Sequence, residues 1–110
     1  MIIGRSQPGI VFLNRGGRIR MVLAKKTMEN IENTAALYYK GRDEEGNQAM
    51  SELIKNLSEL IGTLGDEQKV NELLNILKTA LKAMEEKDYV YLADILNYEI
   101  AGRIEEYIKE

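Results

Sequence analysis

The 110-residue chain contains no cysteine, no histidine and no tryptophan, and it has only one proline and one phenylalanine. Cysteine and histidine are the usual ligands of zinc, haem and iron–sulfur clusters, and they supply the thiolate nucleophile and the commonest general base. Without histidine, the Glu-x-x-His pairs of a di-iron helical bundle are also excluded. We therefore expect a protein that is not an enzyme and that holds no metal and no cofactor.

Long apolar runs are missing as well. No stretch approaches the roughly 20 apolar residues that span a bilayer, and the N-terminus lacks a signal-peptide core followed by a cleavage site. The sequence therefore predicts no membrane span, and we expect a cytoplasmic protein.

Charge divides the chain into two parts. The net charge is −3, from 15 basic and 18 acidic side chains, but the first 26 residues hold six basic side chains and no acid. We predict that residues 1–20 form a basic Gly/Arg-containing segment that is disordered or precedes the true start at Met21, and that residues 21–110 form one domain. The string Arg15-Gly16-Gly17-Arg18 is what an in-frame purine-rich ribosome-binding site upstream of Met21 would encode. Alternatively, the segment is an arm that contacts nucleic acid or an anionic membrane.

Apolar residues recur at helical spacing in four stretches, which predicts an all-α fold. The first helix begins at Thr27 as its N-cap, although the same spacing reaches back to Met21. The other expected signals are Gly41 and Gly65 as helix ends, and Asp66 and Asp88 as N-terminal positions. The connections are too short for parallel neighbours. We therefore predict an antiparallel up-and-down bundle of four helices, one short N-terminal helix and three longer ones.

The apolar stripes predict which residues form the core. The second helix contributes Met50, Leu53, Ile54, Leu57, Leu60, Ile61 and Leu64, and the third contributes Val70, Leu73, Leu74, Leu77, Ala80, Leu81 and Met84.

The last helix is apolar on two sides. One broad face contains Tyr89, Leu92, Ala93, Leu96, Ile100, Ile104 and Tyr107, and a second stripe nearly opposite contains Tyr91, Ile95 and Tyr98, with Asp94 beside it. A helix with two apolar faces is either central in its fold or covered by another molecule. Tyrosine suits an interface because its ring is apolar and its hydroxyl remains hydrated. Asp94 is suited to accept a hydrogen bond from a tyrosine or from a partner's arginine.

A resemblance to a family is carried by two segments. They are Tyr39-Lys40-Gly41 and, at residues 83–99, the run AMEEKDYVYLADILNYE. Together they resemble a family of small, uncharacterised, all-helical proteins from Gram-positive and related bacteria, over roughly residues 28–108. The size and helix order are more loosely similar to the flagellar export chaperone that holds flagellin, without a shared motif.

These observations favour a non-enzymatic protein-binding module, such as an adaptor or chaperone-like bundle. We expect it to bind itself as a homodimer, or another protein, through Tyr91, Asp94, Ile95 and Tyr98. Residues 27–110 hold nine basic and 18 acidic side chains, so we expect no nucleic acid to bind the domain at 21–110. The alternative function, a nucleic-acid or membrane-surface binder, would use the basic arm.

Overall fold

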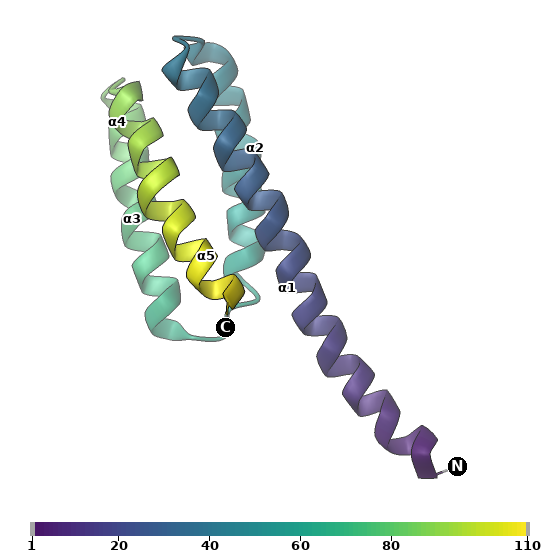
Figure 1. The fold of residues 1–110 in the computed structure, drawn as a ribbon. Coiled ribbons are helices and arrows are strands. Elements are labelled where there is room, and N and C mark those ends of the chain that lie inside the picture. The colour runs from purple at the N-terminus through teal and green to yellow at the C-terminus, as the bar shows by residue number, and fades with distance from the viewer. Residues whose placement is uncertain (1, 110) are drawn as a thin grey trace.

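The computed structural model describes the backbone of residues 2–109 and the side chains of residues 18–108. The elements are α1 (Ile2–Tyr39), α2 (Asp43–Ile61), α3 (Glu67–Glu85), α4 (Tyr89–Asp94), the π-helix η1 (Ile95–Ile100) and α5 (Ala101–Lys109). The last three follow one another without a break and form one helical rod, so α1, α2, α3 and this rod make an antiparallel bundle of four helices (Figure 1). The predicted all-α, four-helix fold is confirmed.

The first helix differs from the prediction. It was expected to be the shortest, and it is the longest, with 38 residues. Thr27 is not its N-cap: the side chain is fully buried, and its hydroxyl donates to the Leu23 carbonyl at 2.7 Å, as a threonine inside a helix can do. Side chains 1–17 lie outside the described residues, so the expectation for the basic segment at 1–20 stays a prediction. At the border of that segment, Arg20 donates to the Thr63 carbonyl at 2.9 Å, beyond the end of α2.

The other helix boundaries agree with the expected signals. Gly41 and Gly65 follow α1 and α2 with positive φ angles of 78° and 66°, a conformation that glycine adopts without steric cost. Asp66 caps α3 by accepting from the backbone N–H groups of Gln68 and Lys69, and Asp88 caps α4 by accepting from that of Tyr91.

Side chains from all four helices form one core. The helix α1 packs against α2 and against the rod, and α3 packs against the rod. Leu74 and Leu81, which were expected in the core, are instead 45% and 40% exposed. The buried side of α3 is set by Leu73, Ala80 and Ala83, and the first two of these lie one position before Leu74 and Leu81. The apolar stripe of α3 is therefore wider than the face that the bundle covers.

At one end of the bundle, the ring of Tyr38 stacks on that of Tyr89, with centroids 5.1 Å apart and planes 7° from parallel. Its hydroxyl donates to the Asn47 side chain at 2.7 Å. Gly46 lies directly beneath the ring: a Cβ at this position would be 2.5 Å from a ring carbon of Tyr38. This contact joins the end of α1 to the beginnings of α2 and α4.

Candidate protein-binding site

The rod changes its winding where the sequence shows two apolar stripes. Residues Ile95–Ile100 form a π-helix, in which hydrogen bonds join residues five apart instead of four. Residues five apart therefore lie on the same side of the helix, and Ile95 and Ile100 are both fully buried. In an α-helix the same two residues would point about 140° apart. The prediction that Ile95 shares an exposed surface with Tyr91 and Tyr98 is wrong, because the π-helix turns Ile95 into the core.

The π-helix also affects which side of the rod faces the core before and after it. The buried residues before the π-helix are Leu92 and Ala93, and those after it include Ala101, Ile104 and Tyr107. In an uninterrupted α-helix, Leu92, Ala93, Ile104 and Tyr107 would share one broad face, but the buried residues Ile95 and Ala101 would lie beyond its two opposite edges. The wider turn reduces this spread, so both halves face the same core.

The tyrosines of the predicted stripe remain at the surface. Tyr91 is 47% exposed and Tyr98 is 74% exposed. They lie on either side of Asp94, which is partly buried at the junction of α4 and η1.

A third tyrosine completes this surface from another helix. The Tyr39 hydroxyl, at the last position of α1, donates a hydrogen bond to Asp94 Oδ1. This hydrogen bond is the main cause of the raised pKa of Tyr39, and burial and the charge of Asp94 raise the pKa further. A side-chain hydrogen bond from Asn97 lowers the pKa, and the nearby Tyr98 raises it. Tyr39 is 44% exposed. Of the two donors expected for Asp94, a tyrosine or a partner's arginine, the structure shows a tyrosine, and it comes from α1. We call Tyr39, Tyr91, Asp94 and Tyr98 the tyrosine surface.

Tyr39 was not among the residues predicted for the site, which were all taken from the last helix. Adjacent residues of a helix point about 100° apart, so Tyr39 lies well to one side of the direction in which Tyr38 points. Tyr38 is 2% exposed, and Tyr39 faces outward. The 100° rotation between adjacent residues was the signal in the sequence that could have placed Tyr39 at the surface.

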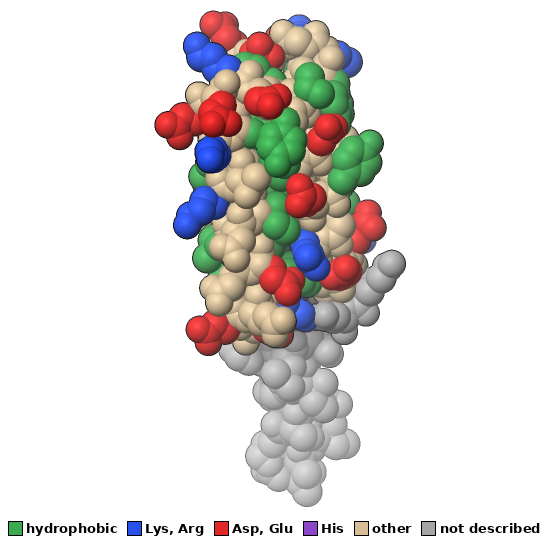
Figure 2. Space-filling view, turned by 90° about the vertical axis from the view of Figure 1, so that its left-hand side faces the viewer, with side chains coloured by type: hydrophobic (Ala, Val, Ile, Leu, Met, Phe, Trp, Pro, Cys, Tyr) green, Lys and Arg blue, Asp and Glu red, His purple; other side chains and the backbone are tan. Residues whose placement is uncertain are grey.

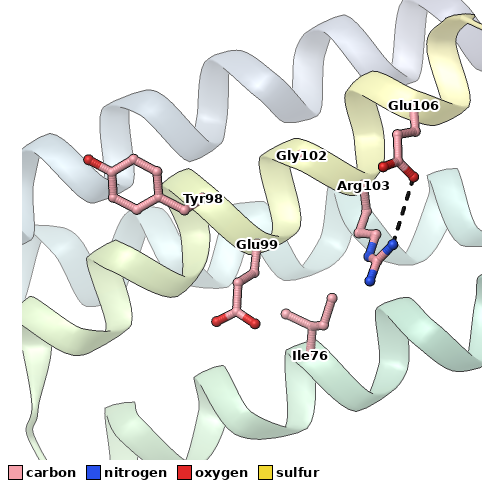
Figure 3. Close-up of a pocket in the computed structure, with 6 residues that line it drawn as sticks. All are labelled: Ile76, Tyr98, Glu99, Gly102, Arg103 and Glu106. Carbon is pink, nitrogen blue, oxygen red and sulfur yellow. Dashed lines mark ion pairs between the residues drawn. The ribbon is translucent and has the colours of Figure 1, made fainter.

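A surface hollow of about 330 Å³ adjoins the tyrosine surface. It lies between α3 and the rod and is lined by Ile76, Tyr98, Glu99, Gly102, Arg103 and Glu106. Figure 3 shows Glu99 and Arg103 pointing from the rod toward Ile76 of α3, while the Tyr98 ring points away from Ile76. A Cβ built on Gly102 would meet no atom within 4 Å, so the rod backbone there borders open space.

Acidic groups surround the one basic group of this hollow. Arg103 Nη1 lies 3.6 Å from Glu72 Oε2 on α3 and 3.7 Å from Glu106 Oε2 on its own helix. Glu99 adds a third carboxylate to the rim. Figure 2 shows hydrophobic side chains among carboxylates on the face of the bundle that it presents. The arrangement offers apolar contact area beside an excess of negative charge.

Two other structural features bear on the predicted function classes. Among residues 18–108, no group of three or more acidic side chains is placed to hold a metal ion. Within the part of the chain that the structure describes, no helix has the length and apolar character needed to cross a membrane. The side chains of the proposed basic arm up to Gly17 lie outside the described residues.

Comparison with known proteins identifies a family and nothing more specific. Residues 22–110 match the family described as "Domain of unknown function (DUF8042)". No curated protein and no solved structure matches the chain. Because the match covers most of its length, the chain belongs to this family.

Proposed function

We propose that this member of the DUF8042 family is a non-enzymatic protein-binding module, which receives a helix from a partner protein or from a second copy of the chain. The observation that carries this proposal is that three exposed tyrosines accompany Asp94, two from its own rod and one, Tyr39, hydrogen-bonded to it from α1. Adaptor and chaperone-like roles are forms of this activity. The tyrosine surface is the proposed contact, with Tyr39 in the place that was predicted for Ile95.

The composition of the tyrosine surface supports protein binding. Tyrosine is enriched at interfaces and at binding hot spots, because it offers a large apolar ring with few rotatable bonds. The Tyr39 ring is held by its hydrogen bond to Asp94, so less side-chain freedom is lost when a partner binds. The rod also provides an exposed side, bearing Tyr91 and Tyr98, along which a second helix can lie.

The negative charge on and around the tyrosine surface supports a basic partner. Asp94 belongs to the surface, and Glu99 and Glu106 lie on the same rod near Tyr98. Residues 27–110 hold twice as many acidic as basic side chains. A partner helix with lysine or arginine beside its apolar face complements this potential, whereas a phosphate backbone is repelled by it.

The test begins with the double variant Tyr91→Glu/Tyr98→Glu. Its matched control is Ser58→Glu/Thr79→Glu, which adds the same charge at exposed positions of α2 and α3. Sedimentation velocity measures self-association, and binding to a library of helical peptides measures capture of a foreign helix.

We expect the wild type and the control to associate in at least one of these assays, and the tyrosine variant to lose that association while its circular dichroism spectrum is unchanged. A folded tyrosine variant that associates as the wild type does, or a wild type inactive in both assays, contradicts the proposal.

A further inference from the structure

We infer that the hollow between α3 and the rod is the pocket for one lysine or arginine side chain of the partner helix. This inference rests on the proposed function and assigns a specific anchor to it. The hollow adjoins the tyrosine surface through Tyr98, which belongs to both. A helix lying along the tyrosine surface would therefore pass over the opening of the hollow.

The size and floor of the hollow suit a long aliphatic stem. Its volume of about 330 Å³ is at the lower end of the range for ligand pockets, and it is large enough for a single extended side chain. Ile76 supplies an apolar contact from α3, and the backbone at Gly102 leaves the rod side open. Lysine and arginine bury their methylene stems on such surfaces while the charged end reaches a polar rim.

The rim selects a cation. Arg103 is flanked by Glu72 and Glu106, so two carboxylates already balance its charge. Glu99 points toward Ile76 from the same side of the rod and brings a further negative charge to the opening (Figure 3). An incoming ammonium or guanidinium group near Glu99 and Glu106 would form charge-assisted hydrogen bonds. An incoming carboxylate would meet the same two acids and be repelled.

Gly102 indicates that this space is not needed for the fold. A glycine inside a helix costs about 1 kcal/mol relative to alanine. Gly46, the glycine inside α2, lies under a tyrosine ring, whereas a Cβ built on Gly102 would meet no atom within 4 Å. A larger residue at position 102 should therefore fill the hollow without disturbing the core.

The test uses a display library of helical peptides randomised along one face and selected on the full wild-type chain. We expect the enriched peptides to share a lysine or arginine at one helical position. Replacing that residue by norleucine should lower affinity about tenfold or more, as the loss of a charge-assisted contact predicts.

The variant Gly102→Leu should bind the selected peptides about tenfold more weakly than wild type, while its unfolding midpoint is equal or higher. The charge variant Glu99→Gln/Glu106→Gln should reduce the preference for the basic peptide over its norleucine form.

Several results would overturn the inference. The inference is wrong if the selection enriches peptides that share no basic residue, or if it enriches no peptide. It is also wrong if Gly102→Leu binds the selected peptides with the affinity of the wild type. If Tyr91→Glu/Tyr98→Glu abolishes peptide binding and Gly102→Leu does not, the proposed function stands and the anchor pocket is wrong. If neither variant changes binding, both proposals are wrong.

Discussion

The phenol of Tyr39 donates a hydrogen bond to the carboxylate of Asp94, 55 residues further along the chain. The pair ties the last residue of α1 to the point where the rod changes from α-helix to π-helix. It also holds one exposed tyrosine ring against the helix that carries two others. The bond therefore links the winding of the rod to the shape of the tyrosine surface.

Removing the hydroxyl in Tyr39→Phe should loosen this ring with little effect on the fold. Because the pair is exposed, we expect the free energy of unfolding to fall by less than about 1 kcal/mol. Binding of a partner helix should weaken several-fold. Urea unfolding and peptide titration measure the two effects. A large loss of stability would show that Tyr39 acts as a core residue.

Alkaline pH should destabilise the bundle through Tyr38. Burial, followed by the neighbouring Tyr89 and Asp43, raises the pKa of Tyr38 to about 12. Its folded-state pKa lies above the unfolded value near 10, so its contribution is complete below pH 10 and is lost as pH rises toward 12. The contribution is on the order of 2 kcal/mol. Thermal unfolding between pH 9 and 12 should show a steeper decline in the wild type than in Tyr38→Phe, and parallel curves would contradict this assignment.

Two glycine-to-alanine substitutions should have opposite effects. Gly46→Ala places a Cβ against the Tyr38 ring and should destabilise by about 1 to 3 kcal/mol through overpacking. Gly102→Ala places its Cβ in open space and should stabilise by about 0.5 to 1 kcal/mol. Urea denaturation of both variants measures the difference. Equal effects would mean that the Tyr38 ring moves aside at little cost.

The π-helix can be tested at Ile95. Since the side chain is fully buried, Ile95→Ala should cost about 2 to 5 kcal/mol, as for other large core residues. The exposed neighbour in the predicted stripe provides the control, and Tyr91→Ala should change stability by about 0.5 kcal/mol or less. If Ile95→Ala were as mild as the control, the rod would be a regular α-helix with Ile95 at its surface.

Much of the fold could be predicted from local signals. Helical spacing of apolar residues, the aspartate caps and the two glycine stops predicted four helices and their antiparallel order. Thr27 was misleading, since the same hydroxyl that caps a helix can also bond to a carbonyl four residues earlier.

The errors in the core of α3 and in the site have a different origin. The exposure of Leu74 and Leu81 depends on how much of α3 its neighbours cover, which one helix alone does not reveal. Ile95 was placed by assuming 100° per residue, and a π-helix breaks that rule locally. Tyr39 meets Asp94 only because α1 and the rod lie side by side in the folded bundle.

The most direct test of the central proposal is the affinity of a selected helical peptide for the wild type and for Tyr98→Ala, measured by fluorescence anisotropy. Tyr98 is 74% exposed, so its truncation should leave the unfolding midpoint unchanged. If the tyrosine surface binds partner helices, the dissociation constant should rise about tenfold or more, as for a hot-spot residue. A dissociation constant within about twofold of the wild-type value would contradict the account.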